Sequence, residues 1–177
     1  GHGSQNMHDA IKNSCDVYFY SMCNRAGVDN IRKAGLALGF EHIFDIGVDN
    51  QKKGLLPSTE WKRTTYKRAA QQKWFAGETI SLGIGQGYNN FTILQLTHAL
   101  ATLVDNGNSR VPHVGRTLID PVTNTRRSIE QPQPVNLGYK QSNVDAVKRG
   151  MVSVVTGGTG RGSFGSARYS AGGKTGT

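Results

Sequence analysis

The stretch Glu78–Gly107, ETISLGIGQGYNNFTILQLTHALATLVDNG, carries the strongest periodic pattern in the chain. Within it, Thr92 and Gln95 have the spacing of a capping box, in which each side chain bonds the backbone N–H of the other residue. Asn106-Gly107 closes the pattern with residues that tolerate a left-handed backbone at a helix end. The pattern predicts a helix with a buried stripe formed by Leu96, Leu100, Leu103 and Val104.

Other helices are predicted on both sides of this stretch. NMHDAIKN (6–13) and VYFYSMCNRAG (17–27) read as two helices interrupted at Ser14-Cys15-Asp16. A third is expected to start at an Asp29 cap and to bury Ile31, Ala34, Gly35 and Leu38 before Gly39. A fourth is expected to be capped by Ser142 or Asn143 and to bury Val144, Val147, Met151 and Val154.

The remaining segments lack helical periodicity. Asp45 to Gly77 is expected to form a long loop or an insertion. Residues 111–130 read as a hairpin turning around Asp120-Pro121 and Asn124, and 163–177 as a strand or hairpin arm.

The composition describes a folded domain, or part of one, with a basic surface. The chain has 177 residues and a formal net charge of +9, from 21 basic and 12 acidic side chains. Such a charge indicates an anionic environment. Nucleic acid, membrane headgroups and an acidic polymer would all provide one. The segment 60–74, EWKRTTYKRAAQQKW, interleaves basic and aromatic residues as single-strand-binding surfaces do, but a solvated loop anchored by two aromatics explains it better.

Two short motifs point to chemistry. Ser14-Cys15-Asp16 lies between two predicted helices and Lys174-Thr175-Gly176 lies on the predicted final strand. They match the second and third elements of the S-x-x-K, S-D-N and K-T-G set of serine acyltransferases. The alternatives are an N-cap pair for Ser14 and Asp16 and an exposed turn for Lys174.

Longer stretches around these motifs resemble one protein family. AIKNSCDVYFY (10–20), GLLPSTEWKR (54–63), GETISLGIGQGY (77–88) and TILQLTHALATLVDNG (92–107) precede GGKTGT (172–177) in the order seen in class B penicillin-binding proteins. The chain resembles their transpeptidase domain over its whole length, and is most similar to the rod-shape, elongation-specific type called penicillin-binding protein 2.

The resemblance implies an α+β fold of the penicillin-binding and serine β-lactamase-like kind, with a helical subdomain and part of an antiparallel sheet. Residues 1–177 would form part of a single transpeptidase domain, between its Ser-x-x-Lys motif and its Lys-Thr-Gly strand. No serine of the chain has a lysine three positions later. The domain is therefore expected to be truncated at both ends, and this chain to be inactive alone.

The activity implied is peptidoglycan D,D-transpeptidation by a serine enzyme. The family's serine attacks the D-Ala-D-Ala bond of a stem peptide, D-Ala leaves, and an amine of a neighbouring stem peptide resolves the acyl-enzyme. By position, Ser14 would relay a proton, Asp16 would orient the substrate amide and Lys174 would supply positive charge. Thr175 and Thr177 would hold the terminal carboxylate of the substrate or of a β-lactam, and Gly176 would let the substrate lie along the strand. The backbone N–H of Thr177 would also form half of the oxyanion hole.

The family also implies a setting and partners. The parent protein would be anchored at the periplasmic face of the bacterial inner membrane, with a SEDS-type glycosyltransferase and elongation-complex proteins as partners and no nucleic acid. No cofactor is required, although some relatives are thought to bind a structural zinc ion, for which His2 and Cys15 occupy two of the ligand positions. A non-catalytic cell-envelope binding module and, less favoured, a basic nucleic-acid-binding domain are the alternatives.

Overall fold

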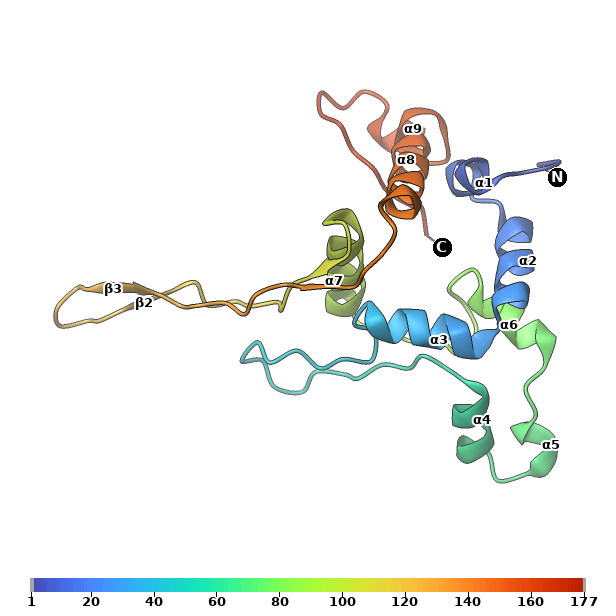
Figure 1. Ribbon diagram of the computed structural model, residues 1–177, viewed down its shortest axis with the longest axis horizontal. Helices are drawn as coiled ribbons and strands as arrows, with labels where there is room; N and C mark the ends of the chain where they lie inside the picture. The colour runs from blue at the N-terminus through green and yellow to red at the C-terminus, as the bar shows by residue number, and fades with distance from the viewer. Residues whose placement is uncertain (1, 177) are drawn as a thin grey trace.

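The computed structural model describes residues 2–176 as helices joined by long irregular segments, with a two-stranded hairpin projecting to one side (Figure 1). The expected Thr177 roles fall on a residue outside this range. No helix among the described residues is long and apolar enough to cross a bilayer.

The N-terminal helices form as the sequence predicts. α1 (Met7–Asn13) is capped by Asn6, whose side chain accepts from the Asp9 backbone N–H, and it ends at Ser14. α2 (Asp16–Ala26) follows after Ser14 and Cys15, and α3 (Val28–Ala37) follows α2 after Gly27. Asp29, however, does not cap α3: its carboxylate accepts from the backbone N–H and the hydroxyl of Thr59 instead. The N-cap of α3 is Gly27, so the Asp29 prediction was wrong.

Three short helices lie within or next to the segment predicted as one long loop. α4 (Thr59–Thr65) begins at Ser58, whose hydroxyl accepts from Trp61 N–H, and α5 (Ala69–Gln72) and α6 (Ala76–Leu82) follow. The part before Ser58 is irregular apart from a single bridge between Leu55 and Asn90, and after it only the short linkers 66–68 and 73–75 are irregular. The loop prediction was wrong for the second half because short helices carry too few turns to show a periodic stripe.

The aromatic and basic segment forms a small cluster of its own. The rings of Trp61 and Trp74 each pack against the ring of Tyr88, and the Lys62 ammonium lies 5.7 Å from the centroid of the Trp74 ring and 6.0 Å from that of Tyr88. Lys62 is buried and forms an ion pair with Glu78. Trp61, Trp74 and Tyr88 are half-buried and in contact with other rings of the segment, which favours the structural interpretation.

The capping-box helix is confirmed, but its buried face is not the predicted one. α7 (Ile93–Val104) starts with reciprocal bonds between Thr92 and Gln95. It buries Gln95, His98, Ala99 and Thr102, whereas Leu96 is 58% exposed and Leu100 and Val104 are also exposed. The predicted stripe is therefore wrong for Leu96, Leu100 and Val104, whereas Leu103 is half-buried and packs on the hydrophobic core. Periodicity identifies an apolar face without showing which part of it the rest of this chain covers.

Polar bonds stabilise the buried side of α7. The Gln95 amide donates to the backbone oxygens of His42 (3.0 Å) and Lys53 (2.9 Å), and its oxygen accepts from Thr92 N–H. His98 lies against Phe44 and contacts the Leu38 carbonyl through Nδ1 and the Ser109 hydroxyl through Nε2. Hydrogen bonds from side chains of α7 therefore fix the irregular segment 38–53 against that helix.

We expect Gln95→Ala to lower the free energy of unfolding by about 1–3 kcal/mol, because it removes a side chain that is only 1% exposed together with its hydrogen bonds to the His42 and Lys53 carbonyls. Thr97→Ala, on the exposed side of the same helix, should change it by less than about 0.5 kcal/mol. Urea unfolding of both variants measures the difference. Equal, small effects would contradict the assignment of Gln95 as a structural link.

The hairpin that follows α7 extends away from the helices (Figure 1). β1 (Asn108–Ser109) pairs antiparallel with β4 (Val135–Asn136) at its base, and β2 (Thr117–Ile119) pairs with β3 (Arg126–Ser128) farther out. At the tip, Asp120 accepts from the backbone N–H groups of Val122 and Thr123, and Asn124 has a positive φ of 58°. The predicted hairpin and its turn are confirmed.

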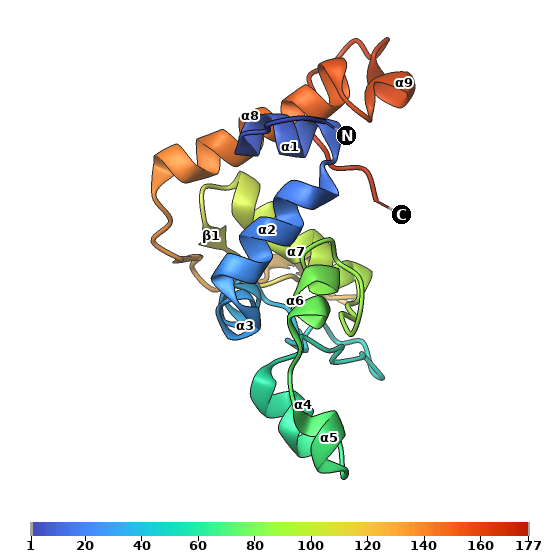
Figure 2. The ribbon, with the colours of Figure 1, turned by 90° about the vertical axis from the view of Figure 1, so that its right-hand side faces the viewer.

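The long helix α8 packs along α1, as both views show (Figures 1 and 2). α8 (Gln141–Gly157) buries Val144, Met151 and Val154, as predicted, and Gly150 lets the side chain of Ile11 approach closely. Its N-cap is Lys140 rather than Ser142 or Asn143. Ile11, Met151 and Val154 form the buried centre, with Met7, Phe19, Leu103 and Val147 around it.

The final segment differs from the prediction. A short helix, α9 (Arg161–Phe164), follows α8, and residues 166–176 form no strand. A strand is defined by a row of backbone bonds to a neighbouring strand. Within the described residues, segment 166–176 makes one backbone bond to a distant element, from Gly173 N–H to the Met151 carbonyl of α8, and one local bond, from Ala167 N–H to the Phe164 carbonyl. The strand prediction for Lys174–Gly176 is therefore wrong within the described residues.

Candidate active site

The two short motifs meet although 160 positions separate them in the chain. The Lys174 ammonium donates to the Ser14 hydroxyl oxygen at 2.6 Å and to the Thr175 carbonyl at 3.0 Å. Neither alternative interpretation describes this arrangement. Ser14 and Asp16 do not cap α2, whose N-cap is Cys15 without a side-chain bond. Lys174 is exposed, as the alternative expected, but it lines the same pocket as Ser14 and bonds its hydroxyl, which a simple exposed turn does not explain.

The end of α1 directs Ser14 into the pocket. Ser14 has φ 53° and ψ 53°, a left-handed conformation that is uncommon for a residue other than glycine and recurs at functional sites. The next residue is tied back by a bond from Cys15 N–H to the Ala10 carbonyl at 2.9 Å, and both Ala10 and Cys15 are buried. The chain therefore turns sharply between α1 and α2.

The pocket has a volume of 620 Å³ and three kinds of wall. One wall carries the polar motif residues Ser14, Asp16, Lys174, Thr175 and Gly176. The glycine-rich loop after α6, residues 83–86, forms another. The third is apolar and consists of Met7, Ile11, Phe19, Val147 and Met151. An apolar cavity with a few converging polar groups is the usual form of a ligand site.

Electrostatics within the pocket centre on Lys174. Desolvation of the ammonium by the pocket walls lowers the pKa of Lys174, and the negative charge of Asp16 opposes this by favouring the protonated form. Burial therefore favours the neutral amine of Lys174, and Asp16 favours the charged ammonium that donates to Ser14.

Some of the pocket was not predicted from the sequence. The loop at 83–86 lines it; the sequence marked this loop by its dense glycine content and as part of a stretch that resembles the family, but gave it no role in the site. Thr159, in the turn after α8, contacts the Thr175 hydroxyl at 2.9 Å, and no motif in the sequence marks it.

The predicted zinc ligands lie beside this pocket. His2 and Cys15 line a neighbouring depression of 600 Å³ together with Asp16, and both Cys15 and Cys23 are free thiols. Among residues 2–176, no group of three or more His, Cys, Asp or Glu side chains is arranged to hold a metal ion. Two candidate ligands do not complete a zinc site, so zinc binding stays a prediction.

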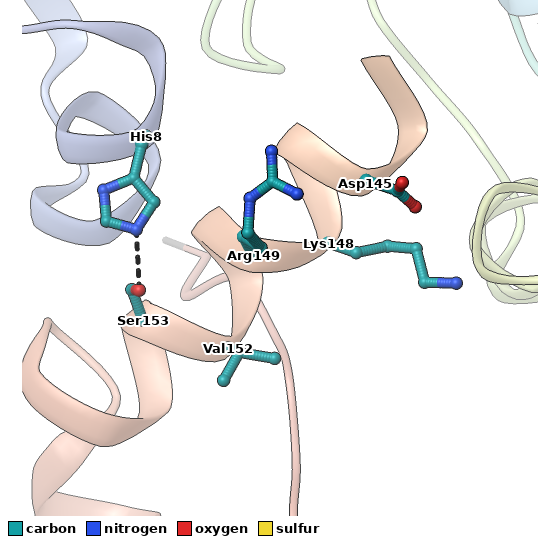
Figure 3. Close-up of a pocket in the computed structure, with 6 residues that line it drawn as sticks. All are labelled: His8, Asp145, Lys148, Arg149, Val152 and Ser153. Carbon is teal, nitrogen blue, oxygen red and sulfur yellow. Dashed lines mark hydrogen bonds between the residues drawn. The ribbon is translucent and has the colours of Figure 1, made fainter. Parts of the chain in front are cut away.

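A depression of 440 Å³ on the outer side of α1 and α8 contains none of the motif residues. Figure 3 shows His8 of α1 reaching Ser153 of α8, at 2.8 Å, while Lys148 points away from this pair. Lys148 donates to the Val104 carbonyl of α7 at 3.0 Å. These contacts join helices and identify no ligand, so the motif pocket is the candidate active site.

Comparison with known proteins agrees with the geometry. The family model for the penicillin binding protein transpeptidase domain matches residues 1–177. The chain is 37% identical over 177 residues to the peptidoglycan D,D-transpeptidase MrdA of Acinetobacter baumannii, covering all of this chain and 25% of that protein. It is 35% identical over 185 residues to MrdA of Haemophilus influenzae, again covering all of this chain and 27% of the relative. The chain thus spans about a quarter of the length of these curated relatives.

Solved structures show the same fold. The structure of Pseudomonas aeruginosa PBP2 in complex with WCK 5153 superposes with a TM-score of 0.79 at 34% identity, over 98% of this chain and 38% of that one. PBP2 of Helicobacter pylori, in its complex with MreC, superposes with a TM-score of 0.81 at 26% identity, over 100% of this chain and 31% of that one. The α+β transpeptidase fold predicted from the sequence is confirmed, and the chain belongs to the penicillin-binding protein transpeptidase family.

Proposed function

We propose that the protein containing this chain is a serine-type peptidoglycan D,D-transpeptidase that cross-links the cell wall during rod-shape elongation and is acylated by β-lactams. The observation that carries the proposal is the bond from Lys174 to the Ser14 hydroxyl, which unites two motifs of the acyltransferase set in one pocket. The sequence relatives named as D,D-transpeptidases support it.

The bond between Lys174 and Ser14 suggests how a proton moves. Because the ammonium donates to the Ser14 oxygen, the hydroxyl proton of Ser14 is free to be donated elsewhere. When the nucleophilic serine attacks the carbonyl carbon of the penultimate D-Ala, the C–N bond breaks and the leaving nitrogen needs a proton. In this proposal the attacking serine gives its proton to the lysine of its own Ser-x-x-Lys motif, and Ser14 donates its proton to the leaving nitrogen. The proton taken from the nucleophile then returns to Ser14, while Lys174 stays charged, a state that Asp16 favours.

The other motif residues would hold the substrate. The Thr175 hydroxyl, and by motif position that of Thr177, would donate to the terminal carboxylate of the stem peptide. Gly176 leaves room above the backbone, since no other atom lies near its missing side chain. The nucleophile itself would come from a Ser-x-x-Lys motif, which this chain does not contain.

The setting follows from the same proposal. The parent protein would act at the periplasmic face of the inner membrane on D-Ala-D-Ala stem peptides. One similar structure is a PBP2 in complex with MreC, and another, 28% identical, concerns a peptidoglycan synthase complex that coordinates polymerization and crosslinking. We therefore propose an MreC-like elongation protein and a SEDS-type glycosyltransferase as partners.

Intact mass tests the proposal. The full-length protein encoded by the gene should gain the mass of one benzylpenicillin on incubation with the drug, because a serine ester forms as the β-lactam amide opens. The 177-residue chain, which has no Ser-x-x-Lys, should gain none. A full-length protein that stays unmodified at saturating drug would overturn the proposed activity.

A further inference from the structure

The turn after α8 links both sides of the motif cluster. Its Thr159 N–H donates to the carbonyl of Lys12, in the last turn of α1 and two residues before Ser14, at 3.3 Å. The Thr159 hydroxyl lies 2.9 Å from the Thr175 hydroxyl. One residue therefore joins the helix end that presents Ser14 to the segment that presents Lys174 and Thr175.

The backbone of this turn is well anchored. The N–H groups of Gly158 and Gly160 both donate to the carbonyl of Val154, a residue that is only 1% exposed. A side chain at Gly158 would clash with the backbone of Lys12, so glycine is needed for the turn to lie against α1. The position of the Thr159 hydroxyl thus follows from packed backbone rather than from a free loop.

The bond between the two hydroxyl groups has a direction that matters for binding. A threonine hydroxyl has one proton, so it can donate to only one acceptor at a time. If Thr175 used its proton on Thr159, it would have none for a substrate carboxylate. If Thr159 donates instead, the Thr175 proton is free for the carboxylate, and the chain of bonds polarises it favourably.

We propose that Thr159 is a positioning residue, which donates to Thr175 and thereby directs the Thr175 hydroxyl proton toward the carboxylate of the stem peptide or β-lactam. This inference rests on the proposed function. It predicts that Thr159 acts through Thr175 alone and contributes to recognition of the carboxylate.

The test compares acylation of full-length variants by benzylpenicillin. We expect Thr159→Val to lower the second-order rate constant about 3- to 10-fold, the effect of one lost hydrogen bond, and Thr159→Ser to restore it to within about twofold. Thr156→Val is the matched control: Thr156 is an exposed threonine of α8 whose hydroxyl bonds only the Val152 carbonyl. It should leave the rate unchanged.

A double-mutant cycle separates positioning from general damage. The Thr159→Val, Thr175→Val double variant should be no slower than Thr175→Val alone, because the partner of Thr159 is already gone. The methyl ester of benzylpenicillin, which lacks the carboxylate, should react equally fast with wild type and Thr159→Val. Thr159→Ala replaces Thr159→Val if the latter has a lower melting temperature than wild type.

The outcomes are distinct. Three results would overturn the role of Thr159: additive losses of acylation rate in the double-mutant cycle, equal losses of rate for the acid and the ester, or no loss of rate in Thr159→Val. In each of these cases, acylation of the wild type would still support the proposed function. Failure of the wild-type protein to react with benzylpenicillin would overturn both.

Discussion

Lys174→Ala is expected to slow acylation of the full-length protein by benzylpenicillin about 100- to 1,000-fold. The ammonium is the donor to the Ser14 hydroxyl in the pocket, and loss of one such charge-stabilising group in acyl transfer has effects of this size. Stopped-flow or quenched mass measurement gives the rate constant. Lys67→Ala, in the exposed segment between α4 and α5, is the matched control and should react as wild type.

The neighbouring Asp16 carboxylate makes the acylation rate depend on pH in a way that can be predicted. Asp16 raises the pKa of Lys174 against the larger lowering by burial, so Asp16→Asn should lower the pKa of Lys174 further. If acylation requires the charged amine, the rate falls as pH rises through this pKa. The alkaline limb of the pH profile should therefore move to lower pH in Asp16→Asn. A wild-type rate in Lys174→Ala, or a limb that moves to higher pH, would contradict the assigned role.

The second large effect concerns stability. Lys62→Ala is expected to lower the free energy of unfolding by about 3–5 kcal/mol, because it leaves the Glu78 carboxylate in a largely buried site without its cation. The Lys62 side chain is 5% exposed and that of Glu78 is 19% exposed. Glu78 also accepts from the Tyr88 hydroxyl and from Phe75 N–H, so the carboxylate ties Lys62 to Tyr88 of the aromatic cluster and to the start of α6.

The neighbouring surface pair supplies the control. Arg63 and Glu60 form an ion pair in which both side chains are 64% exposed, so Arg63→Ala should cost less than about 1 kcal/mol. Urea unfolding of the two variants measures the contrast. Similar losses for Lys62→Ala and Arg63→Ala would contradict the view that burial makes the Lys62 pair structural.

The same pair predicts a pH dependence. Burial alone would raise the pKa of Glu78, but the bonds from Lys62, Phe75 and Tyr88 outweigh it and hold the pKa below its ordinary value. A carboxyl group with a lowered pKa in the folded state contributes stability above its unfolded pKa, which is about 4.3. The difference between wild type and Lys62→Ala should be full near neutral pH and should shrink as pH falls below about 4.

Local patterns in the sequence were enough for the elements whose causes are local. The capping box at Thr92 and Gln95, the break between α1 and α2, and the hairpin turn at Asp120 depend on residues within a few positions of one another. The two motifs were also recognisable, because each is a short run of adjacent residues, and the longer runs around them indicated the family before the fold was known.

Other features depend on partners far along the chain, and only the tertiary structure decided them. Asp29 bonds Thr59 instead of capping its own helix, and α7 buries Gln95 and His98 while Leu96 faces outward. The meeting of Lys174 with Ser14, and the link through Thr159, join residues that no periodicity relates. A sequence pattern records which side chains prefer burial or bonding, but the neighbour that satisfies each one is chosen when distant segments pack together.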